Sequence, residues 1–234
     1  MSGTARRSAP AGRSLARRGP ASGTALALLA GLGLVAPGAH AGSSSDDGSY
    51  GRLAGDLALG LEVGMSEAFP GESLAGRLSA SYLHTAGVYG RYDDSLGLQF
   101  EPTARSVGAG VELRPLFLAR FGGDLEQGPA YFDLFVDSLS IALGAYGAAL
   151  SADDCSGTGL DCWRVGVELG AGVELPLLPH ADGPFIALRG GGRWPAGPRG
   201  AEATAIDRPG GMVSLSLGYR LVVMTHLVDA GDRR

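Results

Sequence analysis

The segment SADDCSGTGLDC, residues 151–162, gathers residue types that bind metals or form covalent links. It holds both cysteines of the chain, Cys155 and Cys162. In an exported protein, two cysteines this close most simply form a local disulfide that holds a loop, and we expect this pairing. A zinc site would need further ligands, and no histidine lies nearby. The segment's carboxylates could instead bind Ca²⁺, but their spacing does not match an EF-hand and a solvated acidic loop is the simpler interpretation: Asp153, Asp154 and Asp161.

The four histidines give little support for catalysis. His40 falls in the N-terminal segment, His84 and His180 fall in predicted exposed turns, and His226 lies in the C-terminal tail. Nucleophilic catalysis needs a His or Ser constellation held in one place, and the sequence indicates none. The glycine run at 190–192 lies inside a predicted strand, where a bulge or close packing is a plainer explanation than a phosphate cradle. We therefore expect a protein without enzymatic activity and without a cofactor.

The stretch Trp163–Leu175, WRVGVELGAGVEL, shows the pattern around which the rest of the chain is organised. Its odd positions are all apolar, and its even positions are glycine or charged residues. A period of two sustained over this length predicts a β-strand with two different faces. A strand facing water normally exposes bulky hydrated side chains, but here the polar face is mostly bare backbone. The pattern favours a polar face that points into a crowded interior and an apolar face that points into lipid.

The same alternation recurs along the chain and predicts eight strands. The fourth strand continues weakly toward Phe121, and the following GGDLEQG predicts a turn. The fifth strand changes parity near Asp137 or Ser138, which one inserted residue in a β-bulge would explain. The eight predicted strands cover Arg52–Met65, Ser73–Tyr82, Ala86–Tyr92, Val107–Arg114, Tyr131–Ala145, Trp163–Leu175, Phe185–Trp194 and Val213–Val223.

The connections and the two tryptophans favour closure of these strands into a barrel. The links after the third, fifth and seventh strands are long, whereas those after the second and sixth are short. This asymmetry is expected when short turns face the periplasm and longer loops face outward. Trp163 begins one strand and Trp194 ends the next, both on the apolar face, so we expect them to meet in an aromatic belt at one rim. The sequence predicts an all-β fold: a closed antiparallel up-and-down transmembrane barrel of eight strands.

The polar face of the predicted strands carries basic and acidic residues in nearly equal numbers. In a lumen of eight strands the side chains fill the space, so buried charges must pair. The register that sets the tryptophans opposite each other also sets Glu168 opposite Arg189, and Arg220 could meet Asp56 where the last strand closes on the first. Inner glycines leave room for the long arginines. The predicted inner charges are Arg52, Asp56, Glu62, Arg77, Arg91, Glu112, Arg114, Asp133, Asp137, Arg164, Glu168, Glu174, Arg189, Arg193 and Arg220.

The first 41 residues have the pattern of a removable export signal. Five arginines precede the apolar run Thr24–Val35, and Ala39–Ala41 supplies the small residues of a cleavage site. A retained transmembrane anchor is the alternative, but the run is short of the roughly 18 residues needed to span a bilayer. We expect a signal peptide over 1–41, cleaved after Ala41. A flexible linker over 42–50, the barrel over 51–225 and a tail over 226–234 would follow.

Composition excludes several classes of protein. Hydrophobic residues make up 45% of the chain, which excludes simple disorder, and the 40 glycines do not recur at every third position as in collagen. All 19 basic residues are arginine, and the formal net charge is −5. Removal of the five N-terminal arginines would leave a net charge of about −10. An acidic excess of this size argues against nucleic acid as a partner.

The export signal, the strand number, the alternation and the loop asymmetry together resemble small bacterial outer-membrane β-barrels of the OmpA and OmpX type. The resemblance covers Arg52 to about Val223. It implies an integral protein of the bacterial outer membrane, with membrane lipid and the outer-membrane assembly machinery as partners. It also implies a non-enzymatic role in envelope structure, surface contact or narrow permeation. One departure is that such proteins commonly end on an aromatic residue, whereas MTHLVDAGDRR follows Val223 here.

A secreted, water-soluble β-barrel is the alternative interpretation. Such a barrel would turn its apolar face inward and bind a small hydrophobic ligand. Its outer surface would then consist largely of Gly, Ala and Ser, which hydrate weakly and protect strand edges poorly. The two interpretations differ in one observable, which is the direction in which the leucines and valines of the strands point.

Overall fold

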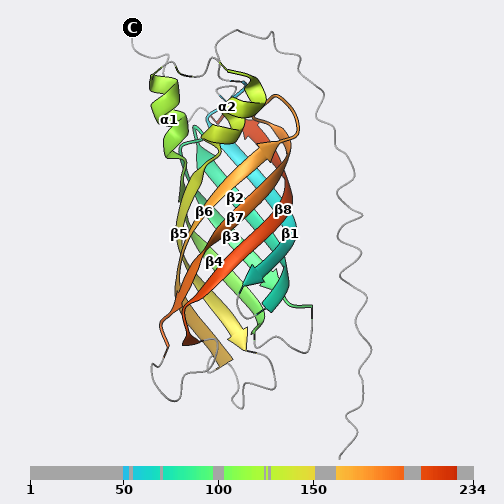
Figure 1. Ribbon diagram of the computed structural model, residues 1–234, viewed down its shortest axis with the longest axis vertical. Helices are drawn as coiled ribbons and strands as arrows, with labels where there is room; N and C mark the ends of the chain where they lie inside the picture. The colour runs from blue at the N-terminus through green and yellow to red at the C-terminus, as the bar shows by residue number, and fades with distance from the viewer. Residues whose placement is uncertain are drawn as a thin grey trace, which may run out of the picture. The chain divides into compact units, whose positions relative to one another are not determined.

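Eight antiparallel strands close into one barrel in the computed structural model (Figure 1). The structure describes residues 50–52, 55–68, 71–96, 103–123, 125, 128–150, 162–197 and 207–225. The strands are β1 (Leu57–Ala68), β2 (Gly71–Tyr82), β3 (Ala86–Asp94), β4 (Thr103–Leu113), β5 (Ser140–Leu150), β6 (Trp163–Pro176), β7 (Gly183–Pro195) and β8 (Gly210–Val223). Each strand pairs with its neighbours in sequence, and β8 pairs with β1 to complete the ring. The predicted closed barrel of eight antiparallel strands is confirmed.

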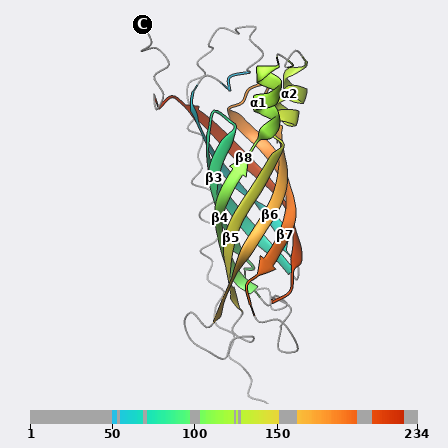
Figure 2. The same cartoon turned by 90° about the vertical axis from the view of Figure 1, so that its left-hand side faces the viewer.

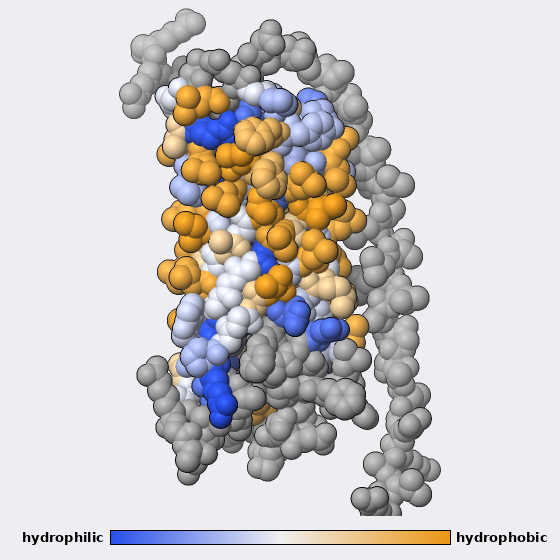
Figure 3. Space-filling model, in the orientation of Figure 1, coloured by the Kyte–Doolittle hydropathy of each residue, from blue (hydrophilic) through white to orange (hydrophobic). Residues whose placement is uncertain are grey.

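Side chains alternate between the lumen and the outer surface along the strands. In β6, Val165, Val167 and Leu169 are exposed on the outer surface, whereas Glu168 and Glu174 are buried. Figure 3 shows hydrophobic side chains over the upper and middle parts of one face of the barrel, with hydrophilic ones near both ends. The two faces therefore have the orientation that the period of two predicts.

Two short helices, α1 (Pro115–Gly122) and α2 (Ala130–Asp137), join β4 to β5. The sequence analysis predicted extended chain over both segments, which was wrong because both are helical. The turn predicted over GGDLEQG, residues 122–128, falls between the two helices and lies partly outside the described residues. Asp133, Leu134 and Asp137 share the buried face of α2. Pro115 suits the start of α1, where no backbone N–H donor is needed. Since β5 begins only at Ser140, the change of parity needs no bulge.

Both helices lie at one end of the barrel, which we call the helical end (Figures 1 and 2). Neither of the two helices among the described residues is long and apolar enough to cross a membrane. The short links after β2 and β6 lie at this same end (Figure 1). The longer connections after β3, β5 and β7 leave from the opposite end, which we call the loop end.

The register between β6 and β7 differs from the predicted one by four residues. Val167, rather than Trp163, lies opposite Trp194. An even shift keeps every side chain on its own face, so the alternation alone cannot distinguish the two registers. The link over residues 177–182 sets the register, and the Leu177 N–H donates to the carbonyl of Pro184 across it at 2.9 Å.

The two tryptophans lie on the outer surface toward the loop end, Trp163 at the start of β6 and Trp194 near the end of β7. Their exposed fractions are 37% and 43%. They do not face each other directly, because the shifted register separates them along the wall. Both nevertheless belong to the loop half of the barrel, where an aromatic belt was expected.

Candidate functional site

Arg189, on β7, lies at the centre of a large group of charges in the described lumen. Its Nη2 lies 2.6 Å from Glu62 Oε1 and 2.8 Å from Glu174 Oε1, and its Nη1 lies 3.5 Å from Glu112 Oε2. These carboxylates come from β1, β6 and β4, so one guanidinium joins strands that are not neighbours in the ring. We call the group the Arg189 cluster; its members are Glu62, Arg77, Glu112, Arg114, Glu174, Arg189 and Arg220.

The other arginines of the Arg189 cluster share the same three carboxylates. Arg114 Nη2 lies 2.8 Å from Glu174 Oε1, and Arg220 also binds Glu174. Arg77 binds Glu112, which lies 3.2 Å from Arg114 as well. Each carboxylate thus contacts at least two guanidinium groups, and four arginines against three glutamates give the cluster a net charge of +1. This sharing satisfies charges that would be costly to bury alone.

The predicted meeting of Arg220 and Asp56 is wrong, again by an even shift of register. Arg220 lies opposite Gly60 in the β1–β8 pairing, four residues beyond Asp56. Its guanidinium therefore reaches Glu174 instead. The Asp56 carboxylate accepts hydrogen bonds from the Thr225 N–H and hydroxyl at 2.6 and 2.7 Å. Asp56 thus holds the chain where it leaves β8, rather than contributing to the lumen.

Arg193, also on β7, holds a second group nearer the loop end, which we call the Arg193 cluster. Its Nε lies 3.1 Å from Glu168 Oε2, and its Nη2 lies 3.2 Å from Asp93 Oδ2. The Tyr89 hydroxyl donates to Glu168 at 2.8 Å, and Arg91 Nε lies 2.8 Å from Asp93 Oδ1. Two arginines therefore balance two carboxylates, with a neutral hydroxyl completing the coordination of Glu168.

The predicted pairing of Glu168 with Arg189 is wrong because it rested on the unshifted register. The observed register places Glu168 opposite Arg193, which follows Arg189 by four residues in β7. Arg164 lies closer to the loop end, and its Nε lies 3.0 Å from Oδ1 of Asp207, which is just before β8. The sequence analysis had assigned Asp207 to a loop and so gave it no role.

Aromatic rings share the lumen with the arginines, and the sequence analysis gave these rings no role. The signal was present, because these rings have the parity of the inner charges in their strands. A guanidinium over a ring face gains from the cation–π attraction without needing a carboxylate. The pairs, with guanidinium-to-ring distances, are Arg77 over Tyr89 at 3.9 Å, Arg193 over Tyr146 at 4.9 Å and Arg220 over Phe185 at 4.9 Å.

Inner glycines make room for these long side chains, as expected. A Cβ on Gly172 would lie 2.8 Å from Arg189 Nη1, and one on Gly144 would lie 2.3 Å from the Tyr89 hydroxyl oxygen. Both distances are too short for real contacts, so any larger residue would displace a member of a cluster. The inner face therefore carries glycines where long side chains from other strands occupy the lumen beside them.

A third group of charges ties the helices to the barrel end. Arg52 was predicted on the inner face of the first strand, but it precedes β1, is buried and binds Asp137 of α2. Arg120 of α1 lies 3.0 Å from Asp137 and also binds Asp133. The Arg52 guanidinium lies 4.6 Å from the ring centroid of Phe117. The two aspartates predicted for the lumen thus belong to the helices that cover its end.

His84 is buried beneath α1, although an exposed turn residue was predicted. Its exposed fraction is 3%, and its ring packs edge-on against Phe117 with centroids 6.2 Å apart. Burial, reinforced by the positive charges of Arg220, Arg114 and Arg52, holds the pKa of His84 well below its ordinary value. Its Nε2 has no hydrogen-bond partner within the described part of the chain. The imidazole therefore acts as a neutral packing group.

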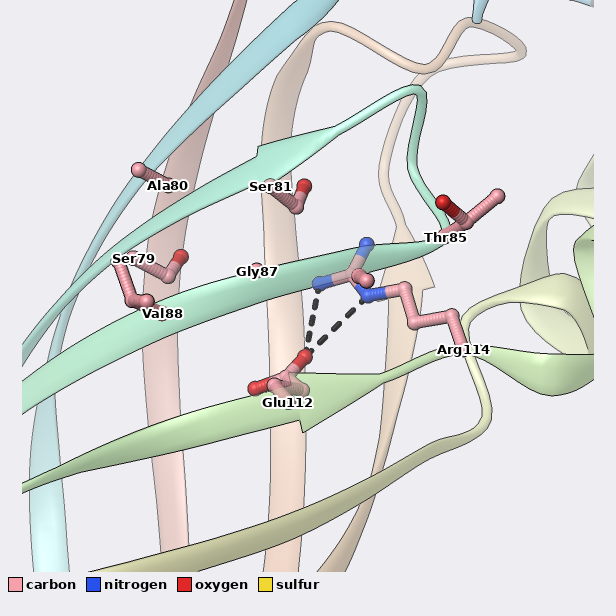
Figure 4. Close-up of a pocket in the computed structure, with 9 residues that line it drawn as sticks. Ser79, Ala80, Ser81, Thr85, Gly87, Val88, Glu112 and Arg114 are labelled. Carbon is pink, nitrogen blue, oxygen red and sulfur yellow. Dashed lines mark hydrogen bonds and ion pairs between the residues drawn. The ribbon is translucent and has the colours of Figure 1, made fainter.

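A small cavity lies between β2, β3 and Arg114 (Figure 4). The figure shows the Arg114 guanidinium directed at the Glu112 carboxylate, with both Nε and Nη2 at 3.2 Å from Oε1. The cavity has a volume of about 10 Å³, roughly the space that one water requires. It is too small for an organic ligand.

Several sequence predictions fall outside the described residues. Cys155 is one of them, so its disulfide with Cys162 stays a prediction, as does calcium binding by Asp153, Asp154 and Asp161. Within the described ranges, no group of three or more His, Cys, Asp or Glu side chains could hold a metal ion. His180 lies exposed in the link between β6 and β7. The Arg189 and Arg193 clusters thus fill the described lumen with paired charges.

No protein-family model matches this chain, and no curated protein sequence matches it. Among solved structures, Ail, the attachment invasion locus protein of Yersinia pestis, is similar in part. It was solved in complex with the heparin analogue sucrose octasulfate, shares 15% sequence identity with this chain and has a TM-score of 0.33. The likeness covers 70% of this chain and 96% of that one. Similarity at this level carries no argument about the present protein.

Proposed function

We propose that this protein is an integral β-barrel of the bacterial outer membrane. The observation that carries the proposal is the inversion of polarity across the barrel wall, with apolar side chains exposed outward and charges buried inside. Water-soluble monomers rarely expose apolar patches larger than a few hundred Å². Strands of 9 to 14 residues also suit a tilted crossing of the hydrocarbon layer, which takes about 9–11 residues.

The proposed location implies a route and partners. Residues 1–41, outside the described residues, would act as a signal peptide cleaved after Ala41. Membrane lipid would contact the outer wall, and the outer-membrane assembly machinery would insert the barrel. The helical end would face the periplasm and the loop end the exterior, as the short links after β2 and β6 and the longer links after β3, β5 and β7 suggest. Two connections depart from this asymmetry, because the link from β1 to β2 at the loop end is short and the link from β4 to β5 at the helical end is long.

We propose that the barrel acts through its surfaces, in envelope structure or surface contact, rather than by catalysis or conduction. Support comes from the two charge clusters, in which side chains from distant strands meet across the lumen. A filled lumen of eight strands has no space for a wide aqueous path. Neither a cofactor nor an enzymatic activity forms part of this proposal.

The soluble alternative conflicts with the structure. A ligand-binding barrel needs an apolar interior, but the described interior holds Glu62, Glu112, Glu168 and Glu174 with their arginine partners. The leucines and valines that would have lined such a pocket face outward. We therefore do not retain this alternative.

Membrane extraction tests the location. We expect the full-length protein to remain in the membrane fraction after washes with high salt and alkaline carbonate, and to require detergent for release. The extracted protein should migrate differently on detergent gels before and after boiling, because a closed barrel resists the detergent until heated. Release by carbonate alone would contradict the proposal.

Planar-bilayer recording tests whether the lumen is closed. Wild type should show no conductance steps. The double variant Arg189→Ala/Glu112→Ala removes two side chains that meet across the lumen and keeps the net charge, so it should show steps. The matched control Leu188→Ala/Val111→Ala trims outward neighbours on the same strands and should stay silent. Steps in wild type would favour narrow permeation instead.

A further inference from the structure

The two helices turn their charged residues inward. α1 and α2 together hold three charged residues, Arg120, Asp133 and Asp137. Arg120 forms ion pairs with both aspartates, and Asp137 also binds Arg52. Both aspartates are buried. Neither helix therefore presents an unpaired charge to its surroundings.

The opposite surface of the helices is apolar and exposed. Leu118 and Phe132 have exposed fractions of 63% and 59%, and Tyr131 has one of 48%. A helix on the surface of a water-soluble domain shows the reverse arrangement, with apolar residues inside and charges outside. We call this surface the helical foot; its residues are Leu118, Phe121, Tyr131, Phe132, Phe135 and Leu139.

The helical foot continues the outer wall of the barrel. Leu113 ends β4 just before α1, and Leu139 and Ile141 join α2 to the wall of β5; all three are exposed outward. The wall and the helices thus share the same inversion of polarity and meet without a charged residue among these positions. On the face drawn in Figure 3, hydrophobic side chains reach the upper part of the barrel, where the helices lie.

We propose that the helical foot lies in the membrane interface at the helical end of the barrel, with its aromatic and leucine side chains at the boundary between headgroups and acyl chains. The proposal rests on the proposed function. Helices of eight residues are too short to cross a bilayer but can lie in the plane of the interface, where aromatic residues are favoured. Because the foot exposes no Lys or Arg among the described residues, its binding should not depend on anionic lipid.

Tryptophan fluorescence in lipid vesicles tests the proposal. In a Trp163→Phe/Trp194→Phe background, Phe132→Trp provides a single reporter on the foot, with Phe121→Trp as a second. The whole barrel is inserted into phosphatidylcholine vesicles, and heat-modifiable migration confirms folding. We expect emission shifted to shorter wavelength, strong quenching by lipids brominated on the acyl chain and weak quenching by acrylamide. Added phosphatidylglycerol should change none of these.

Two controls in the same background separate the possible failures. Leu169→Trp reports on the outer wall and should be quenched by brominated lipid. His180 is exposed in the link between β6 and β7, which also lies at the helical end. Acrylamide should therefore quench the reporter in His180→Trp. If both foot reporters behave like the one at position 180 while that at position 169 contacts lipid, the helical foot proposal is overturned. If the reporter at position 169 is itself in water, the proposed function fails.

Discussion

Glu168 and Leu169 are neighbours in β6, yet their surroundings are opposite. The glutamate is 2% exposed and shares its oxygens with Arg193 and Tyr89, whereas the leucine is 47% exposed on the outer wall. Inside the wall, other side chains of the protein supply the ion pairs of the buried charges. Outside it, the protein leaves apolar surface that only a nonpolar environment can satisfy. The comparison teaches that the inner surface is stabilised by specific partners and the outer surface by its medium.

Removal of a shared carboxylate should disturb the inner surface most. Glu174 contacts Arg114, Arg189 and Arg220, so Glu174→Gln would leave four arginines with two carboxylates. We expect a loss of about 3–5 kcal/mol in the free energy of unfolding, because buried cations lose their partner. Urea unfolding in vesicles measures this. An unchanged midpoint would mean that water reaches the cluster.

A charge placed on the outer surface should cost nearly as much, for a different reason. Leu169→Arg puts a cation on the lipid side near the middle of β6, and we expect a loss of about 2–4 kcal/mol. The same urea titration measures it, with Leu169→Ala as a control for lost apolar area. Equal stability of the Arg and Ala variants would break the contrast between the two surfaces.

Glu168, which contacts one arginine and one neutral hydroxyl, should be easier to replace than Glu174. In Glu168→Gln the amide oxygen can still accept from the Tyr89 hydroxyl, and Arg193 keeps Asp93 at 3.2 Å. We expect a loss of about 1–3 kcal/mol, smaller than for Glu174→Gln. Parallel unfolding of the two variants sharpens the comparison within the lumen. A larger loss of unfolding free energy for Glu168→Gln than for Glu174→Gln would show that the number of arginines around a carboxylate does not decide the cost of replacing it.

His84 should make stability depend on pH at the helical end, where the two surfaces meet. Its folded-state pKa lies below the ordinary value of 6.5, so the unfolded chain binds the proton first as pH falls. From pH 6.5 downward, stability should therefore fall by up to about 1.4 kcal/mol per pH unit, and above that range it should be flat. His84→Asn suits the positive φ of +55° and cannot take up this proton. Identical pH profiles for both proteins would contradict the prediction.

The alternation of residues such as those in Trp163–Leu175 was enough to predict eight strands with two different faces, although the fifth begins later than predicted. It could not predict register, because a shift of four residues leaves every face unchanged and only the link over 177–182 distinguishes the choices. Partners of Glu168 and Arg220 were therefore wrong, although their placement in the lumen was right.

The helices escaped prediction for another reason. AYFDLFVD in α2 has enough apolar residues at alternate positions to pass for a strand, and eight residues are too few to show a helical period clearly. Arg52, Asp133 and Asp137 were recognised as buried charges but assigned to the wrong part of the barrel. The burial of His84 depends on α1 lying over it, so it could not be foreseen once that helix was missed.

The seam between β1 and β8 sets the order in which this chain can be completed. Leu57 pairs with Val223, so the first strand waits for the last before half of its backbone hydrogen bonds exist. A chain truncated before β8 would have two open edges, at β1 and β7, which could pair with strands of other chains. The 14 residues of β8 therefore close the barrel, and their loss should yield aggregates rather than a smaller barrel.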